Sequence, residues 1–263
     1  MSPYRAKKRL GQNFLISEII INQIVDEINP QAEDNIIEIG PGRGSLTLKL
    51  AESGARVIAI EYDHDLIGYL KKLFRKKENV KIINQDFLTY QPSLKKFKLL
   101  GNLPYNLTSP IINWTIKHRT EVVSALFMLQ KEVAERVSSN PGSKDWSPLA
   151  IFTQLFFEVS ICFIVSKESF SPSPKVSSAV IKLVPKKKTI ENIPQEFEQV
   201  VRAAFKQRRK LLVNNLAMIF KKSNREIKEI VEATKLPPKV RAEQVTTGQF
   251  LKLTELLKMS NIL

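Results

Sequence analysis

The chain of 263 residues has little of the residue types that build disulfides and metal centres. Cys162 is its only cysteine, which excludes an intrachain disulfide and a thiolate cluster, so we interpret it as a buried structural thiol. His64 and His118 are its only histidines, too few for a histidine-rich metal site. We therefore expect no metal.

Long apolar segments are also missing. The N-terminus is basic and has no apolar signal core. The most apolar region, Leu149–Val165, is interrupted by Gln154 and Glu158, so it is too short and too polar to cross a bilayer. We therefore expect a cytoplasmic protein without a membrane partner.

Acidic residues are scarce relative to basic ones. The chain has 26 Asp and Glu against 41 Lys and Arg, a net charge of +15 and a pI near 9.8. Such an excess suits a polyanionic partner, because Lys and Arg displace counterions from phosphates without reading sequence. Charge alone does not choose among RNA, DNA and an anionic membrane surface. The length suits one large domain and a smaller appendage.

Buried strands and amphipathic helices alternate over the first half of the chain. A helix at Glu18–Ile28 is followed by strands expected at 35–39, 56–60, 80–83, 98–100 and 122–129, with helices between most of them. This rhythm predicts right-handed crossovers and a mostly parallel, doubly wound sheet. The fold class is therefore α/β and Rossmann-like.

The pattern changes after residue 158. Strands at Val159–Val165 and Ser178–Val184 have no room for a crossover helix between them, so we expect an antiparallel pair, as in methyltransferases and unlike most nicotinamide-binding folds. Residues 186–263 read as four helices and hold 17 basic and 8 acidic residues. We predict an α/β domain at 1–187 and a small, basic, all-α domain at 188–263.

Four polar elements follow successive strands of the predicted sheet: the glycines of Gly40-Pro-Gly42, then Glu61, Asp86 and the tetrapeptide Asn102–Tyr105. Carboxyl ends of parallel strands share one edge, where open α/β sheets bind ligands. Glycines there admit a ligand close to the backbone, Glu61 can accept from ribose hydroxyls, and Asp86 can accept from an adenine amine. The glycine motif alone is also compatible with a nicotinamide site or a plain turn.

The tetrapeptide Asn102-Leu103-Pro104-Tyr105 indicates methylation of an amine. The nitrogen lone pair of an adenine N6 amine is delocalised, so the amine must be turned toward tetrahedral geometry by two acceptors for its hydrogens. The Asn102 side-chain carbonyl and the Leu103 main-chain carbonyl can supply them. Pro104 stiffens the loop, and Tyr105 offers a face for a flipped-out base. The alternative is an Asn-Pro turn beside a core tyrosine.

With these residues identified, the chain resembles the ribosomal RNA adenine N6,N6-dimethyltransferase family, and within it the bacterial enzymes of the small subunit. The likeness extends from Lys8 to about Val245. Its motifs are Gly11-Gln-Asn-Phe-Leu15, Glu38–Gly44, Asn102–Tyr105, Leu129-Gln-Lys-Glu-Val133, Phe170-Ser-Pro-Ser-Pro-Lys-Val176, Phe205-Lys-Gln-Arg-Arg-Lys210 and Arg241-Ala-Glu243.

The resemblance implies a cofactor, a substrate and site residues. The cofactor is S-adenosylmethionine, which leaves as S-adenosylhomocysteine, and the implied contacts are Asn13, Leu15, Gly40, Glu61, Asp86 and Asn102, with the N-terminal segment folded over the cofactor. Phe170 is implied to face the target base opposite Tyr105, although locally it could equally be a core residue. The implied substrate is two adjacent adenosines in the 3′-terminal helix loop of 16S rRNA, on the assembling 30S subunit. We expect a monomer.

The chain departs from the family in one stretch. Lys144–Leu149 contains Trp146 where the bacterial enzymes usually have Tyr-Gly-x-Leu, which puts the local loop shape in doubt. Three other functions compete: a macrolide-resistance methylase acting on 23S rRNA, a non-catalytic ribosome-assembly factor with the same fold, and a nicotinamide oxidoreductase. The last would leave Asp86 and Asn102–Tyr105 without a role.

Basic clusters recur along the chain, and a single cluster is more often a solvated face than a binding site. Two are placed where RNA contacts would be expected, beside the N-terminal segment and at the start of the helical domain. We predict that RNA contacts come from Lys7, Lys8, Arg9, Arg208, Arg209 and Lys210.

Overall fold

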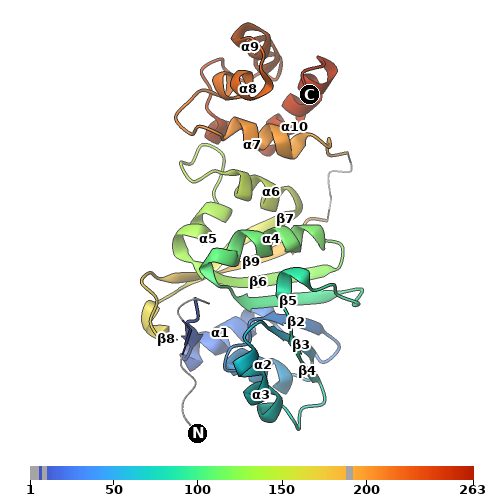
Figure 1. Ribbon diagram of the computed structural model, residues 1–263, viewed down its shortest axis with the longest axis vertical. Helices are drawn as coiled ribbons and strands as arrows, with labels where there is room; N and C mark the ends of the chain where they lie inside the picture. Colours follow the sequence, from blue (N-terminus) through green and yellow to red (C-terminus); the bar gives the residue numbers. More distant parts are fainter. Residues whose placement is uncertain (1–5, 8–10, 188–191) are drawn as a thin grey trace. The chain divides into compact units, whose positions relative to one another are not determined.

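The computed structural model describes residues 6–7, 11–187 and 192–263, and its largest element is a seven-stranded sheet (Figure 1). In chain order the strands are β2 (Asn35–Ile39), β3 (Arg56–Glu61), β4 (Val80–Asn84), β5 (Phe97–Asn102), β6 (Val122–Gln130), β7 (Phe157–Val165) and β9 (Ser178–Pro185). Their order across the sheet is β4-β3-β2-β5-β6-β9-β7.

All pairs from β4 to β6 are parallel, whereas β9 runs antiparallel to both of its neighbours, β6 and β7. The predicted fold class and the antiparallel pairing of the two late strands are confirmed. The antiparallel strand is last in the sequence but lies inside the sheet, between β6 and β7. The order of the strands reverses at β2, which opens a crevice between the carboxyl ends of β2 and β5.

Helices around this sheet occupy the expected segments: α1 (Glu18–Ile28), α2 (Ser45–Glu52), α3 (His64–Leu73), α4 (Thr108–Lys117) and α5 (Lys131–Val137). The sequence sets the ends of α1, because the Ser17 hydroxyl accepts from the Ile20 N–H and Asn29 ends the helix at a φ of 46°. Ile36 and Ile37 of β2 are fully buried, as befits a central strand covered on both faces.

A two-stranded sheet brings the N-terminal segment beside a distant part of the chain. β1 (Phe14–Leu15) pairs antiparallel with β8 (Phe170–Ser171), with Leu15 opposite Phe170. Ile16 extends this contact by donating its N–H to the Ser169 carbonyl at 2.9 Å. The segment before α1 is therefore held against residues 169–171 rather than projecting from the fold. Short 3-10 turns at Phe87–Thr89 (η2), Tyr105–Leu107 (η3), Lys167–Ser169 (η4) and Ala242–Gln244 (η5) complete the elements.

The described residues separate into two compact units, the first ending at Ala134 and resuming over Phe157–Lys186, the second comprising Glu135–Phe156 and Lys187–Leu263. The second unit contains α7 (Phe197–Ala204), α8 (Leu212–Phe220), α9 (Asn224–Ala233) and α10 (Thr247–Met259), the four helices expected from the sequence. It also contains α6 (Pro148–Phe156), which was not predicted.

This division differs from the predicted domains 1–187 and 188–263, because an insertion from the middle of the chain belongs to the helical unit. Trp146, Ile151 and Leu155 are buried in one cluster with residues of α7 to α10, and the Trp146 indole donates to the Val245 carbonyl at 2.9 Å. The apolar run from Leu149 to Val165 contains both a helix and a strand, and periodicity alone does not separate them. Trp146, the departure from the family pattern, is thus a core residue.

Candidate active site

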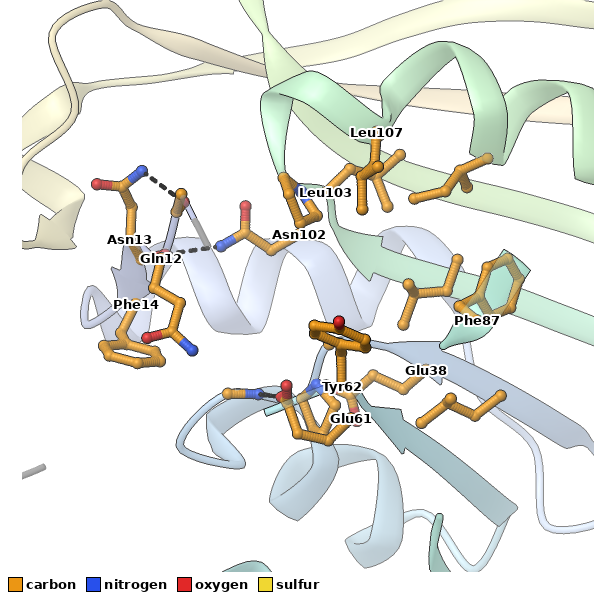
Figure 2. A pocket seen from close by; sticks show the side chains of 18 of the residues that line it. Gln12, Asn13, Phe14, Glu38, Glu61, Tyr62, Phe87, Asn102, Leu103 and Leu107 are labelled. Atoms are coloured by element: carbon orange, nitrogen blue, oxygen red, sulfur yellow. Dashed lines mark hydrogen bonds between the residues drawn. The ribbon is translucent and has the colours of Figure 1, made fainter. Parts of the chain in front are cut away.

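A cavity of about 360 Å³ opens at the carboxyl ends of the parallel strands, and Figure 2 shows its side chains. Its lining comes from the N-terminal segment, the turn after β2, the ends of β3, β4 and β5, and the start of α4. The lining residues predicted from the sequence are Asn13, Leu15, Gly40, Gly42, Glu61, Asp86, Asn102, Leu103, Pro104 and Tyr105.

The glycines after β2 are required by the backbone and by space. Gly40 and Gly42 have φ values of 64° and 57°, a region that L side chains rarely adopt. A Cβ on Gly42 would lie 2.9 Å from the Phe14 ring. A Cβ on Gly40 would meet no other atom of the described residues within 4 Å and would project into open space. Gly40 therefore lets a ligand approach the main chain.

Glu61 ends β3 as a buried carboxylate held by main-chain donors. Its Oε1 accepts from the Asp63 N–H at 2.8 Å, and its Oε2 accepts from the Gly42 N–H at 3.2 Å. Burial raises the pKa of Glu61, and these two hydrogen bonds oppose the rise. Each oxygen keeps a further lone-pair direction, so the carboxylate can accept from a ligand hydroxyl.

Glu38 lies deeper in the same lining. Burial raises the pKa of Glu38 to about 7; the hydrogen bond from the Thr47 hydroxyl opposes this rise, and neighbouring Glu61 adds to it. The Thr47 Oγ1 to Glu38 Oε2 distance is 2.5 Å. Two carboxyl groups in one apolar lining thus differ in environment, with Glu61 fixed by main-chain amides and Glu38 by one hydroxyl.

Asp86 follows β4 and caps the short turn η2. Its Oδ1 accepts from the Leu88 N–H at 2.9 Å, which fixes the side chain at the cavity edge. The carboxylate is exposed and keeps its other oxygen for a ligand donor.

Asn102, the last residue of β5, has its amide orientation set by the N-terminal segment. Its Nδ2 donates to the main-chain carbonyl of Asn13 at 2.9 Å, a bond drawn dashed in Figure 2. With the nitrogen committed to that carbonyl, Oδ1 is the atom left as an acceptor. Asn13 in turn donates its side-chain amide to the Gly11 carbonyl at 3.2 Å.

The residues after Asn102 are held by the neighbouring strands. Leu103 donates its N–H to the Met128 carbonyl of β6 at 2.9 Å and buries its side chain. Pro104 has a φ of −57° and begins the η3 turn. Tyr105 places its hydroxyl 3.1 Å from Ser178 Oγ at the start of β9, which fixes the ring. The tetrapeptide is therefore a rigid loop, and its Tyr105 ring has a defined direction.

Phe170 is the predicted site residue that the structure does not bring to the cavity lining. It is 4% exposed, pairs with Leu15 across the small sheet, and packs in a core cluster with residues of α1, β2 and β6. Of the two possibilities open from the sequence, this placement matches the core residue. Phe170 supports the segment that lines the cavity rather than facing the cavity itself.

The basic residues predicted to contact RNA have different surroundings. Lys7 lies 2.6 Å from Asp63 Oδ1 and 2.5 Å from Asp65 Oδ2, so its ammonium group serves an internal ion pair. Lys8 and Arg9 lie outside the described residues. Arg208, Arg209 and Lys210 are exposed in the helical unit, where Arg208 also donates to the Lys144 carbonyl.

Several lining residues were not singled out from the sequence, among them Gln12, Phe14, Tyr62, Leu88 and Leu107. Gln12 and Phe14 lie within the Gly11–Leu15 motif, and Tyr62 and Leu88 lie within two residues of predicted strand-end carboxylates. Proximity to those motifs was the available signal. Leu107, from η3, had none, because its role depends on how the loop folds back.

No three or more His, Cys, Asp or Glu side chains of the described residues are grouped so as to hold a metal ion. Among the same residues, no helix has both the length and the apolar character needed to cross a membrane.

Comparison with known proteins identifies the family. Residues 4–259 match the family described as ribosomal RNA adenine dimethylase. The chain belongs to this family. It is 42% identical to ribosomal RNA small subunit methyltransferase A of Francisella tularensis subsp. novicida, over 96% of this chain and 98% of the relative. It is 40% identical to the protein of the same name from Xylella fastidiosa, over 94% of each. The predicted resemblance is confirmed.

Solved structures agree with this family. The crystal structure of a dimethyladenosine transferase from Plasmodium falciparum superposes with a TM-score of 0.80 at 28% identity, covering 94% of this chain and 98% of that one. The 23S rRNA methyltransferase ErmE superposes with a TM-score of 0.74, also at 28% identity, covering 94% and 100%. The fold of this chain is therefore that of an S-adenosylmethionine-dependent methyltransferase.

The cavity fits that cofactor. Its volume lies within the range of small-molecule sites, roughly 300–1,000 Å³. Open space in front of Gly40 admits a ligand against the main chain, and two carboxylates, Glu61 and Asp86, stand at successive strand ends with lone pairs to spare. Apolar walls from Ile60, Phe87 and Leu88 suit a flat heterocycle.

We predict that Gly40→Ala selectively weakens cofactor binding. The methyl group would enter the open space in front of the turn, and the left-handed backbone would cost about 1–2 kcal/mol in stability. Calorimetric titration with S-adenosylhomocysteine should give a dissociation constant raised by about tenfold or more, a loss of about 1.4 kcal/mol. The control is Gly142→Ala, which has a φ of 92° and open surroundings in the helical unit. Equal affinities of the two variants for S-adenosylhomocysteine would contradict a role for the Gly40 turn in binding the cofactor.

A second prediction concerns how the Glu38 carboxyl changes the stability of the protein with pH. Because its pKa is about 7 in the folded state and about 4.3 in an unfolded chain, the folded protein binds more protons between these pH values. The contribution of the protonated Glu38 carboxyl to the free energy of unfolding is full below the pKa of the unfolded chain, and it is lost as the pH rises toward 7.

Urea unfolding at pH 5 and pH 7.5 measures this effect. Glu38→Gln keeps an acceptor for Thr47 but removes the titration, so the wild type should lose on the order of 2 kcal/mol more than the variant over this interval. Glu78→Gln, at an exposed glutamate, is the control and should follow the wild type. Parallel pH profiles for the wild type and Glu38→Gln would refute the assignment.

Proposed function

We propose that this protein transfers methyl groups from S-adenosylmethionine to the N6 amines of two adjacent adenosines in the 3′-terminal helix loop of 16S rRNA during small-subunit maturation. One observation supports the chemistry above the others: Asn102 lines the cavity with its Nδ2 bonded to Asn13, which leaves Oδ1 as an acceptor. A fixed hydrogen-bond acceptor in an Asn-Leu-Pro-Tyr loop can accept from the target amine and direct its lone pair.

Residues around the cavity would hold the cofactor by complementary groups. Glu61 would accept from the ribose hydroxyls, Asp86 from the adenine amine, and the turn at Gly40 and Gly42 would lie against the methionine part. Bound there, S-adenosylmethionine supplies an electrophilic methyl group on a sulfonium sulfur. Asn13 and Leu15 belong to the segment that covers the cavity.

The loop would prepare the amine. Asn102 Oδ1 and the Leu103 carbonyl accept its two hydrogens, which draws the nitrogen out of conjugation and directs its lone pair. No hydrogen bond to the Leu103 carbonyl occurs among those of the described residues, so that oxygen is available to a substrate. Because Leu103 is anchored to Met128 and Pro104 restricts the chain, neither acceptor has to be ordered when substrate arrives.

Tyr105 would stack on the target base, with its ring direction set by Ser178. No general base is needed before transfer, since a neutral amine can attack and the methylated ammonium then loses a proton to water. An active site without a histidine dyad agrees with this chemistry. It also explains why the buried Glu38 need not act as a base.

The choice of the small subunit over the large one is supported by the relatives. Proteins named ribosomal RNA small subunit methyltransferase A are 40–42% identical to the chain, whereas the 23S rRNA methyltransferase ErmE is 28% identical. The segments Leu129–Val133 and Phe205–Lys210 favour the same choice from the sequence. A non-catalytic assembly factor is disfavoured by the intact Asn102–Tyr105 loop and Glu61.

The helical unit would supply a second contact with rRNA. Arg208, Arg209 and Lys210 lie together before α8, exposed to solvent. Phosphates are recognised by such exposed cations without sequence preference. We propose that this cluster, rather than Lys7, docks the RNA backbone, and that the protein acts as a cytoplasmic monomer.

Replacing Asn102 tests the mechanism. Asn102→Ala removes one of two acceptors, so methyl transfer to small subunits that lack the modification should fall on the order of 10²- to 10³-fold, with S-adenosylhomocysteine affinity reduced only a few-fold. The control is Ser109→Ala, an exposed position on α4. Labelled methyl groups from the wild type should map to adenines of 16S rRNA. Near-normal turnover of Asn102→Ala would exclude it as an acceptor, and labelling of 23S rRNA instead would support the rival methylase.

Neutralising the helical cluster tests the RNA contact. The triple variant Arg208→Gln, Arg209→Gln, Lys210→Gln should bind rRNA more weakly and flatten the slope of log affinity against log salt by about 2–3, while cofactor affinity stays constant. The matched control is Lys71→Gln, Lys72→Gln, Lys76→Gln, which removes the same charge from the exposed end of α3 and the residues after it. Equal losses in both triples would mean that net charge, not this cluster, determines binding.

A further inference from the structure

Asp63 contacts both the N-terminal segment and Glu61 of the cavity. Only 3% of its side chain is exposed, and it follows β3 at the start of α3. Its carboxylate accepts from Lys7 Nζ at 2.6 Å and from Gln12 Nε2 at 2.8 Å. Its main-chain N–H donates to Glu61 Oε1 at 2.8 Å. One residue therefore holds both the N-terminal segment and the carboxylate of the cofactor cavity.

Lys7 and Gln12, which both contact Asp63, also contact each other. The Lys7 N–H donates to Gln12 Oε1 at 2.8 Å, while the amide nitrogen of that side chain is committed to Asp63. Gln12 is thus oriented by two partners of opposite kind. Ala6 packs against the cluster of Phe14, Leu66 and Phe74, which adds apolar contact to the polar anchor.

Asn13 then connects Gln12, which is bonded to Asp63, to the Asn102–Tyr105 loop. Gln12 is bonded to Asp63, and the carbonyl of the next residue, Asn13, accepts from Asn102 Nδ2 at 2.9 Å. Asn13 lies between Gln12, whose side chain is bonded to Asp63, and Phe14, which pairs with Ser171, so both neighbours restrict where the Asn13 carbonyl can lie. Movement of that carbonyl would free the Asn102 amide to rotate and offer N–H groups where an acceptor is required.

We propose that Asp63 is a positioning residue for methyl transfer: through Gln12 and Asn13 it holds the Asn102 amide with its oxygen toward the substrate amine. This inference rests on the proposed function. It gives Lys7 a part in ordering the segment in place of a direct RNA contact. It also links cofactor binding to the reacting loop, because Asp63 contacts Glu61 as well as Gln12.

Asp63→Asn is the main test, in the full-length protein. Asparagine caps a helix as well as aspartate, so α3 should still begin at this residue. However, an amide has one acceptor oxygen in place of two, and its NH₂ would face the donors of Lys7 or Gln12. Gln12→Ala is the second variant, since it leaves Asp63 with its cap, its Glu61 contact and Lys7. Asp65→Asn is the control, because Asp65 is exposed and Lys7 keeps Asp63 when it is lost.

Two measurements decide the outcome. Hydrogen exchange of the cofactor-free protein should become about tenfold faster over residues 11–16 in Asp63→Asn and Gln12→Ala, with β2 to β6 unchanged. In steady-state methylation of small subunits, kcat should fall about 10- to 100-fold while the KM for the subunit changes little. Asp65→Asn should match the wild type in both.

Faster exchange with an unchanged kcat would overturn the positioning role, as would wild-type exchange and kcat in both variants. An inactive wild type would instead contradict the proposed function, and the exchange data would still show whether Asp63 anchors the segment. A fall in kcat with equally faster exchange across the whole sheet would mean general destabilisation and would also overturn the proposal.

Discussion

The hydrogen bond from Asn102 Nδ2 to the Asn13 carbonyl is the interaction on which the site depends. An asparagine amide has two chemically opposite ends, and only one of them can accept from an amine. By committing the nitrogen to a main-chain oxygen, the N-terminal segment selects the end that remains. In the proposed function, a residue from before the first helix thereby sets which end of the Asn102 amide can accept from the substrate amine, 89 positions away in the sequence.

The sheet makes this contact possible. The reversal of strand order at β2 places the ends of β2 and β5 beside an open crevice, so the glycine turn and the Asn102–Tyr105 loop share one cavity. The β1–β8 pair keeps the N-terminal segment at that edge. Phe170 contributes from the core side, through its pairing with Leu15.

Much of this could be predicted from the sequence, because the signals were local. The strand at Asn35–Ile39 is a short buried run and the helix at Glu18–Ile28 has apolar residues at helical spacing, and both match the structure residue for residue. That Glu61 and Asp86 lie at one edge of the sheet follows from the parallel order of the strands that they end or follow. What the sequence missed or left open depends on contacts between distant residues. The membership of Trp146 in the helical core and the ion pairs of Lys7 with Asp63 and Asp65 were missed, and the burial of Phe170 was one of two open possibilities. A basic side chain looks the same in sequence whether it meets phosphate or carboxylate.

The most direct measurement is a crystal structure of the protein with S-adenosylhomocysteine and an adenosine. We expect the sulfur inside the cavity, with Asn102 Oδ1 and the Leu103 carbonyl within hydrogen-bonding distance of the adenosine N6, about 2.7–3.2 Å. We also expect Asn102 Nδ2 to stay on the Asn13 carbonyl. A sulfur bound away from the Asn102–Tyr105 loop, or an Asn102 amide turned so that its nitrogen faces the adenosine, would contradict this arrangement.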